Sequence, residues 1–279
     1  MKEAAGSSTL RVATLNLWGR QGAWDERRAV LVDGLRGLRP DVIAFQDVIK
    51  SEGYDQATDL LDEGYHVAHQ SNRAPDGSGV SIASRWEVGD VRELDLRPTP
   101  RTAGLPYGAL VAEVLAPEPV GPVLVVNQRT AFPFGGELDR ELQTVLTARL
   151  VEGLVGERHV VIASDLNASP DSASVRFWRG LQSLEGTSVC YRDAWESAHP
   201  GEPGHTFTPC NPLVAGGEMP LELGRRIDYV MVRCGDHGPT LEVTSCELIF
   251  DEPVDGVWAS DHFGVVADLA TRTSGEPAA

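Results

Sequence analysis

The sequence predicts an α/β protein whose sheets are mixed or antiparallel, not a doubly wound parallel sheet. Short apolar runs typical of strands outnumber amphipathic stretches typical of helices, and many successive strands are joined by short connections. The chain has 279 residues, of which 42% are hydrophobic and 23% charged, so it can bury a sizeable core. No linker or repeat separates two cores. We therefore expect a single domain over residues 10–270, with flexible tails at residues 1–9 and 271–279.

The predicted strands are short runs of apolar residues. Residues 10–18 alternate between polar and apolar side chains, which favours a strand with one buried face. The runs at 41–46 and 160–163 are nearly continuous and indicate buried strands. In chain order the predicted strands are 10–18, 41–46, 80–84, 109–115, 123–127, 160–163, 227–233, 241–250 and 265–269.

The predicted helices carry apolar residues three or four positions apart. Residues 24–38 follow this spacing and end before Pro40, which cannot continue a helix. Residues 137–155 form the clearest such stretch and end at Gly156. The predicted helices are 24–38, 54–61, 137–155 and 172–179, and loops rich in proline and glycine cover 97–108, 131–136 and 200–217.

The chain is acidic, with 24 Lys+Arg against 41 Asp+Glu and a formal net charge of -17. Such a charge repels the phosphate backbone of nucleic acid, so we expect a small-molecule substrate and argue against nucleic acid as a partner. No apolar run approaches the roughly 20 residues of a membrane helix, and the first residues lack the apolar core of a secretory signal. We therefore expect no membrane partner and a cytoplasmic location.

Polar side chains stand at the ends of several predicted strands. Single cases have simple structural explanations, such as a turn residue for Asn16 or an Asx-turn for Asp165 and Asn167. Asp228 lies inside an apolar run and needs a buried partner, either an adjacent arginine or a histidine. Several strands that each deliver one such side chain indicate a shared polar cleft at one edge of the sheets. These side chains are Asn16, Gln46, Asp47, Asn127, Asp165, Asn167, Asp228, Asp261 and His262.

The same positions fall in five short motifs spread along the chain. They are T-L-N-L-W at 14–18, F-Q-D-V at 45–48, S-D-L-N at 164–167, R-R-I-D-Y-V at 225–230 and S-D-H-F-G-V at 260–265, with I-A-S-R-W at 82–86 in support. Their order resembles the endonuclease/exonuclease/phosphatase superfamily, and the resemblance spans nearly the whole chain. It implies the DNase I-like fold, a four-layer α/β/β/α sandwich, and metal-assisted hydrolysis of a phosphoester.

The resemblance also implies a metal site. Asn16, Asp47 and Asp261 match positions that hold a divalent ion, Mg²⁺ or Mn²⁺, and Mg²⁺ prefers such oxygen ligands. The family usually has glutamate where this chain has Asp47. Aspartate keeps the charge but shortens the side chain by one methylene, so the ion must shift, gain a bridging water or bind more weakly.

Catalytic roles follow from the same resemblance. Asp165 matches the residue that orients or deprotonates the attacking water, and Asn167 matches the amide that holds a phosphate oxygen. His262 matches the histidine at the phosphoryl group, with Asp228 as its orienting carboxylate. We therefore expect the side chains of Asp228 and His262 to touch.

Two further positions depart from the family. A histidine usually follows the strand that ends at Asn127, and here its place falls to Gln128 or Arg129. Glutamine cannot be a cation or transfer a proton, and arginine supplies fixed charge but no proton. Ser164 stands where the family commonly has glycine, which adds a hydroxyl at a tight turn.

Four functions remain open at this point. The first is an Mg²⁺-dependent phosphoesterase of a small or medium organic phosphoester, with Asn127, Trp18 and Trp258 as expected substrate contacts. The second is a repurposed member that uses the same metal cleft for cyclisation, elimination or hydrolysis of a metabolite without phosphate. The third is a catalytically silent binding domain. The fourth is a sequence-unspecific nuclease, which the net charge disfavours.

Overall fold

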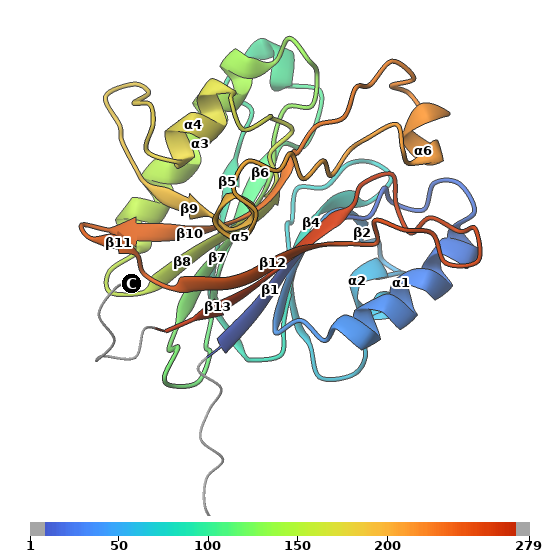
Figure 1. The fold of residues 1–279 in the computed structure, drawn as a ribbon, viewed down its shortest axis with the longest axis horizontal. Coiled ribbons are helices and arrows are strands. Elements are labelled where there is room, and N and C mark those ends of the chain that lie inside the picture. Colours follow the sequence, from blue (N-terminus) through green and yellow to red (C-terminus); the bar gives the residue numbers. More distant parts are fainter. Residues whose placement is uncertain (1–8, 272–279) are drawn as a thin grey trace, which may run out of the picture.

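Two β-sheets lie face to face, and helices cover their outer faces (Figure 1). The computed structural model describes residues 9–271. In this part of the chain the order of layers is helix, sheet, sheet, helix, so the α/β fold class and the sandwich are confirmed. The predicted tails at 1–9 and 271–279 lie outside the described residues, except for Thr9 and Thr271.

The first sheet is mixed. Its strands β1 and β2 are parallel, and its other neighbours pair antiparallel. In spatial order its strands are β12 (Glu242–Ile249), β13 (Gly264–Ala270), β1 (Thr9–Asn16), β2 (Val42–Ile49), β4 (Ser78–Ser84) and β3 (His66–His69). Helices α1 (Trp24–Leu38) and α2 (Gln56–Leu60) share a buried apolar cluster with its outer face.

The second sheet is mixed as well, with β7 and β8 parallel. In spatial order its strands are β11 (Gly238–Pro239), β10 (Asp228–Gly235), β8 (His159–Asp165), β7 (Val123–Arg129), β6 (Gly108–Val114) and β5 (Val88–Asp95), with β9 (Tyr191–Asp193) beside β10. Helices α3 (Glu137–Leu154) and α4 (Ala173–Trp178) cover its outer face. Two short helices, α5 (Ala194–Ala198) and α6 (Pro212–Ala215), lie in the later loops, and a 3₁₀ turn covers Pro100–Thr102. None of the helices within residues 9–271 has the length and apolar character that crossing a membrane requires.

The predicted helices and strands are present with small shifts at their ends, but several short or edge elements were missed. Strand β5 has the sequence VGDVRELD and is exposed or half-buried along its length, so its charges hide the strand pattern. The predicted strand 10–18 ends at Asn16, because Trp18 turns the chain with a positive φ of 54°. The predicted helix 54–61 begins at Gln56, because the Asp55 side chain accepts hydrogen bonds from the first backbone N–H groups.

Helix α1 is joined to the end of β12 by one aromatic contact. The Phe250 ring packs on Gly34, where an added Cβ would lie 2.3 Å from the ring atom Cε1. At Gly37, one turn further along, such a Cβ would meet nothing within 4 Å. The absence of a side chain at Gly34 therefore lets the ring approach the helix.

Strand directions bring one set of ends to a common edge. Strands β1 and β2 end there, and β13 begins there because it runs antiparallel to β1. In the second sheet β8 ends where β10 begins, with Asp165 directly opposite Asp228. The polar side chains of the candidate active site lie at this edge.

Candidate active site

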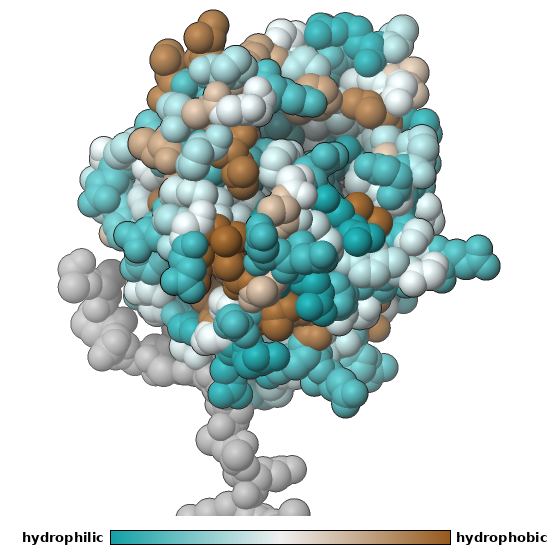
Figure 2. All heavy atoms as spheres, turned by 90° about the vertical axis from the view of Figure 1, so that its right-hand side faces the viewer, coloured by the Kyte–Doolittle hydropathy of each residue, from teal (hydrophilic) through white to brown (hydrophobic). Residues whose placement is uncertain are grey.

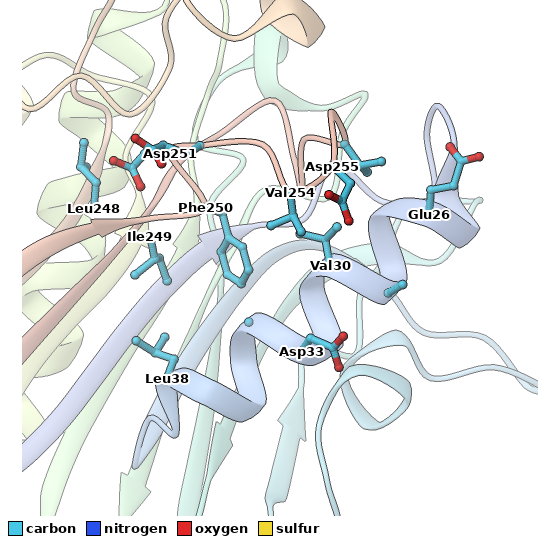
Figure 3. Close-up of a pocket in the computed structure, with 14 residues that line it drawn as sticks. Glu26, Val30, Asp33, Leu38, Leu248, Ile249, Phe250, Asp251, Val254 and Asp255 are labelled. Carbon is cyan, nitrogen blue, oxygen red and sulfur yellow. The ribbon is translucent and has the colours of Figure 1, made fainter.

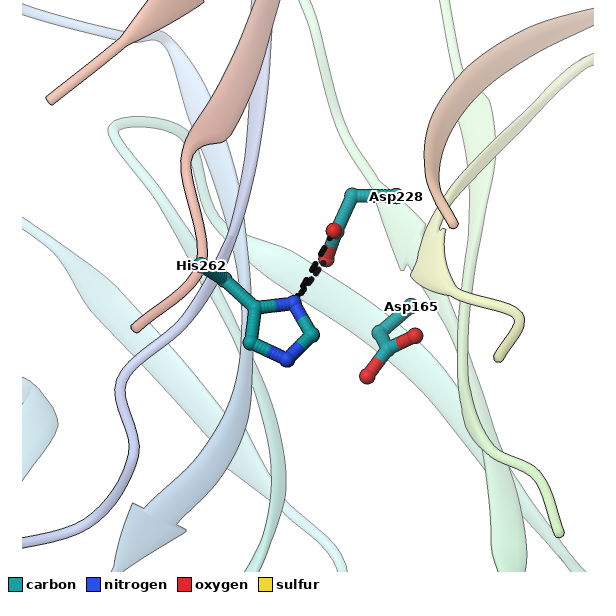
Figure 4. A group of neighbouring side chains, drawn as sticks. All are labelled: Asp165, Asp228 and His262. Atoms are coloured by element: carbon teal, nitrogen blue, oxygen red, sulfur yellow. Dashed lines mark hydrogen bonds and ion pairs between the residues drawn. The ribbon is translucent and has the colours of Figure 1, made fainter. Parts of the chain in front are cut away.

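A carboxylate–histidine–carboxylate group lies at this edge, buried between the sheets (Figure 4). His262 Nδ1 lies 3.0 Å from Asp228 Oδ2 and 3.3 Å from Oδ1. Asp165, Asp228 and His262 each offer a ligand atom within 4.8 Å of the others. The Phe207 ring packs on the imidazole, with ring centroids 4.9 Å apart. The predicted contact between Asp228 and His262 is therefore present.

Burial and charge shift the protonation of this group. Burial raises the pKa of Asp165 to about 7, and the negative charge of Asp228 acts in the same direction. Burial alone would lower the pKa of His262, but the charge and hydrogen bond of Asp228 raise it to about 10, with help from Asp165 and Asp261. The histidine is thus held as a cation among carboxylates at neutral pH.

Asn16 connects the two sheets at the site. Its Nδ2 donates to Asp47 Oδ2 at 3.2 Å and to Asp165 Oδ2 at 3.1 Å. Its Oδ1 accepts from the backbone N–H of Trp18 at 2.9 Å, so the turn after β1 fixes the amide. The backbone carbonyl of Asn16 accepts from Ser260 Oγ at 2.7 Å, which fastens the loop that carries the S-D-H motif to β1.

Asp47 reaches the site from an irregular point of β2. The pairing of β2 with β4 shifts register between Phe45 and Val48, and Asp47 has a positive φ of 48°. Its Oδ1 lies 3.0 Å from Arg129 Nη2 as an ion pair, yet makes no hydrogen bond within residues 9–271. Asp47 therefore presents a buried oxygen that is held by charge alone.

The structure distinguishes between the two residues at the place of the family's histidine. Arg129 lies directly opposite Asp165 in the pairing of β7 with β8 and contacts Asp47. Gln128 is fully buried on the other face, where its Oε1 accepts from Thr147 of α3. Arg129 therefore joins the polar cluster, and Gln128 does not.

Asn127, expected to contact substrate, is fully buried between the sheets. Its Nδ2 donates to the backbone carbonyls of Phe45 and Ser81, both at 2.9 Å. Its Oδ1 accepts from Gln46 Nε2 at 2.8 Å. These bonds engage the amide between the sheets, and none of them joins Asn127 to Asp165, Asp228 or His262.

Asn167 follows Asp165 in a tight turn. Its backbone N–H donates to Asp165 Oδ1 at 2.9 Å, and it has a positive φ of 51°. The Asx-turn considered from the sequence is therefore present, and it places Asn167 beside the cluster. Ser164, at the family's glycine position, accepts from the Gln128 N–H at 3.0 Å and so binds β8 to β7.

The two tryptophans expected at the substrate are packed on neighbouring side chains and are partly exposed. The guanidinium of Arg27 lies 5.0 Å from the centre of the Trp18 ring, and Trp258 stacks on Phe263 at 5.8 Å. No contact joins either ring to the carboxylates among the described interactions.

Sequence reasoning missed Arg27, a buried arginine beside the site. It donates to the carbonyls of Leu17, Gln21 and Ala259, so it binds the loop after β1 to the loop that carries Asp261. Burial lowers its pKa to about 10, while the charge of Asp261 opposes that shift. The helical spacing of α1 could have predicted its burial, because Arg27 shares one helix face with the buried residues Trp24, Leu31 and Leu35.

The carboxylates suit a hard divalent cation. Burial raises the pKa of Asp261, and the nearby negative charge of Asp47 raises it further, while His262 lowers it. Carboxylate oxygens such as those of Asp47 and Asp261 are the ligand types that Mg²⁺ and Mn²⁺ take. Asn16 turns its Nδ2 to Asp47 and Asp165 and its Oδ1 to the Trp18 N–H, so its amide must rotate before it can offer an ion its oxygen. The buried Oδ1 of Asp47 accepts no hydrogen bond within residues 9–271, and it already faces a cation, the Arg129 guanidinium, at 3.0 Å.

A separate pocket of about 680 Å³ lies between α1 and residues 248–257 (Figure 3). None of the predicted site residues lines it, and its floor is apolar around Phe250. The ionisable residues that line it are acidic: Glu26, Asp33, Asp251, Glu252 and Asp255. Figure 2 shows the face at the right-hand side of Figure 1. Hydrophobic residues are exposed there in separate patches among hydrophilic ones, and the upper part of this face is hollowed.

Comparison with known proteins agrees with the order of the motifs. The model of the endonuclease/exonuclease/phosphatase family matches residues 13–262. D. rerio TDP2 complexed with single strand DNA product superposes with a TM-score of 0.76 at 20% identity, over 95% of this chain and 100% of that chain. The endonuclease/exonuclease/phosphatase from Bacteroides vulgatus gives 0.73 at 21% identity, over 95% and 99%. The human Nocturnin catalytic domain with bound sulfate anion gives 0.72 at 16% identity, over 95% of each chain.

No curated protein matches the sequence. The structural comparison corrects one expectation, since nucleic acid was argued against as a partner and a small molecule preferred. A protein of this fold, D. rerio TDP2, was solved with a single strand DNA product, so that exclusion is wrong. Net charge sums over the whole surface, whereas charges are screened beyond about 8 Å in physiological salt. The charge of -17 therefore does not decide what binds at the carboxylate–histidine cluster.

Proposed function

The chain belongs to the endonuclease/exonuclease/phosphatase family, and on this premise we propose that it is a divalent-metal-dependent hydrolase of phosphoesters. One observation carries the proposal. Asp165 and Asp228 of the second sheet lie beside a histidine that is hydrogen-bonded to Asp228, and Asn16 connects them to Asp47 of the first sheet. The reaction needs charge neutralisation at an anionic phosphoryl group and a group that handles the proton of water, and this cluster offers both.

The metal ligands in this proposal are Asn16, Asp47 and Asp261, with Mg²⁺ or Mn²⁺ as the ion. Two observations support the assignment: the buried Asp47 oxygen accepts no hydrogen bond and faces a cation, and the negative charges of Asp47 and Asp261 act on one another. When bound, such an ion supplies positive charge to the phosphoryl oxygens.

The chain's own residues divide the remaining work. His262 is kept cationic and oriented by Asp228, and it donates from Nε2 to a phosphoryl oxygen. Asp165 orients the attacking water and accepts its proton at a carboxylate oxygen. Asn167, in the turn after β8, holds a phosphate oxygen through its side-chain amide. Trp18 and Trp258 remain candidates for contact with the organic part of the substrate.

A second candidate is the same cleft acting on a substrate without phosphate. The engagement of Asp47 by Arg129 favours this alternative, because it leaves a fixed protein cation where the family usually has a histidine. A substrate panel separates the two functions. The panel contains bis(p-nitrophenyl) phosphate, p-nitrophenyl phosphate and a single-stranded DNA oligonucleotide, each with Mg²⁺, with Mn²⁺ and with EDTA.

We expect hydrolysis of at least one of these phosphoesters, its loss in EDTA, and its loss in Asp165→Asn and His262→Ala. We also expect Mg²⁺ to raise the melting temperature of the parent and not of Asp47→Ala, because a ligand stabilises the state that binds it. Asp90→Ala, at an exposed ion pair on β5, is the control and should behave as the parent. Hydrolysis that persists in EDTA, or an unchanged response of Asp47→Ala to Mg²⁺, would overturn the proposal.

A further inference from the structure

Arg129 places a fixed positive charge on the carboxylate that the proposed function gives to the metal. Its Nη2 lies 3.0 Å from Asp47 Oδ1, and its Nη1 donates to Ser78 Oγ at 3.3 Å. The side chain is 19% exposed, so water screens the pair only in part. The oxygen that Arg129 contacts is the same oxygen that makes no hydrogen bond within the described residues.

A divalent ion bound at Asp47 Oδ1 would compete with this guanidinium for the same oxygen. Mg²⁺ binds oxygen at about 2.0–2.1 Å in a near-octahedral shell, which leaves little room for a second cation on the same atom. Two cations at that separation also repel one another strongly in a partly buried site. An ion at Asp47 Oδ1 would therefore require Arg129 to move away from this oxygen.

The contacts of Arg129 are weak compared with those of the other arginines nearby. Arg27 donates to three backbone carbonyls, and Arg73 donates to Gln70, Gly77, Val48 and Val80. Arg129 has one long bond to a hydroxyl and an ion pair without hydrogen-bond geometry. The positive charges of Arg73 and Arg129 also act on one another. Arg129 is therefore the arginine that can leave its partner most readily.

From this arrangement, and building on the proposed metal site, we propose that Arg129 is an internal competitor of the metal. It occupies Asp47 in the free protein and lowers the affinity of the site for divalent cations. An oxyanion that accepts hydrogen bonds from the guanidinium removes the competitor, so a divalent cation and an oxyanion bind cooperatively. By linkage, each then tightens the binding of the other by the same factor.

The test is calorimetric titration of Mn²⁺ into the full chain, with and without sodium sulfate at constant ionic strength. We expect Arg129→Met to bind Mn²⁺ at least about tenfold more tightly than the parent, because one charge is removed beside the ion. Arg129→Lys keeps the charge and should stay close to the parent. Arg36→Met removes the same charge from an exposed ion pair on α1 and should also match the parent.

Sulfate is the probe for the oxyanion. Sulfate should increase the affinity of the parent for Mn²⁺. It should leave the Mn²⁺ affinity of Arg129→Met unchanged. Equal Mn²⁺ affinity in Arg129→Met and Arg36→Met would overturn the proposal, and so would weaker binding by Arg129→Met. If Arg129→Met does not unfold cooperatively, Arg129→Gln, which can still donate to Ser78, replaces it under the same criteria. The proposed function is judged separately, by EDTA-sensitive hydrolysis in the parent, so the two can fail independently.

Discussion

The Nδ1 atom of His262 lies 3.0 Å from the Oδ2 atom of Asp228, and this contact joins the two sheets. His262 precedes β13 of the first sheet, and Asp228 opens β10 of the second. The pair is buried, with 6% and 1% of the two residues exposed. A single hydrogen-bonded pair therefore aligns residues that come from opposite halves of the sandwich.

Replacing Asp228 with asparagine tests this alignment. Asp228→Asn keeps the size of the side chain and removes the charge that holds His262 as a cation. We expect kcat for phosphoester hydrolysis to fall about 10²- to 10⁴-fold, the usual contribution of a positioned acid or base. Asp90→Asn on the exposed face of β5 is the matched control. A kcat equal to that of the parent, measured with Mg²⁺ on a folded variant, would show that the pair only stabilises the fold.

The amide of Asn127 should be a determinant of stability and not of substrate affinity. Asn127→Ala removes the donor to the carbonyls of Phe45 and Ser81, and it removes one of the acceptors of Gln46 Nε2, which still donates to Thr14. We expect a loss of about 3 kcal/mol in the free energy of unfolding, measured in urea, because buried polar groups become unsatisfied. Asn72→Ala, at an exposed position, should change it by less than about 0.5 kcal/mol. A near-neutral Asn127→Ala with a raised KM would instead support the substrate contact expected from the sequence.

Restoring the family's histidine should have different consequences at Gln128 and at Arg129. Gln128→His places an imidazole against Thr147 of α3, away from the carboxylates. We expect it to cost about 1–3 kcal/mol of stability and to leave kcat of the folded protein unchanged. Arg129→His changes the group beside Asp47 and should alter both kcat and the affinity for Mn²⁺. A higher kcat in Gln128→His would refute this assignment of the two side chains.

Two glycines of α1 provide a matched pair. Gly34→Ala puts a methyl group into the Phe250 ring, and we expect a loss of about 1–3 kcal/mol as the ring is displaced. Gly37→Ala meets nothing within 4 Å and should stabilise the protein by up to about 1 kcal/mol through higher helix propensity. Urea unfolding of both variants measures the difference. Equal effects would mean that Phe250 does not hold α1 to β12.

Much of the site could be predicted because apolar strands end in polar residues, and the motifs preserve their order. The faces of β7 could not be assigned in the same way. Val123 and Val125 face the other sheet, whereas Leu124 and Val126 face α3, so both faces are apolar and the pattern does not distinguish them. The pairing of β7 with β8 places Arg129 opposite Asp165, on the face toward the first sheet. The hydrogen bond from Thr147 of α3 places Gln128 on the outer face.

Other features depend on contacts that have no local signal. The irregular pairing that carries Asp47 is set by β4, far along the chain, and its positive φ is not typical of aspartate in a strand. The error about nucleic acid had a different origin. The net charge of -17 sums over 279 residues and does not describe the charges near one site.

The pairing of β1 with β13 has a consequence for how the protein is made. Leu10 lies opposite Leu269, so the middle of the first sheet is assembled from strands at opposite ends of the described chain. Contacts between such distant segments form slowly, because the entropy of closing a long loop is lost before the contacts contribute any stability. During synthesis β1 stays without one neighbour until residues 264–270 have left the ribosome. The strand that carries Asn16 thus leaves the ribosome well before its neighbour β13, and until β13 pairs with it that edge is open to chaperones and to aggregation.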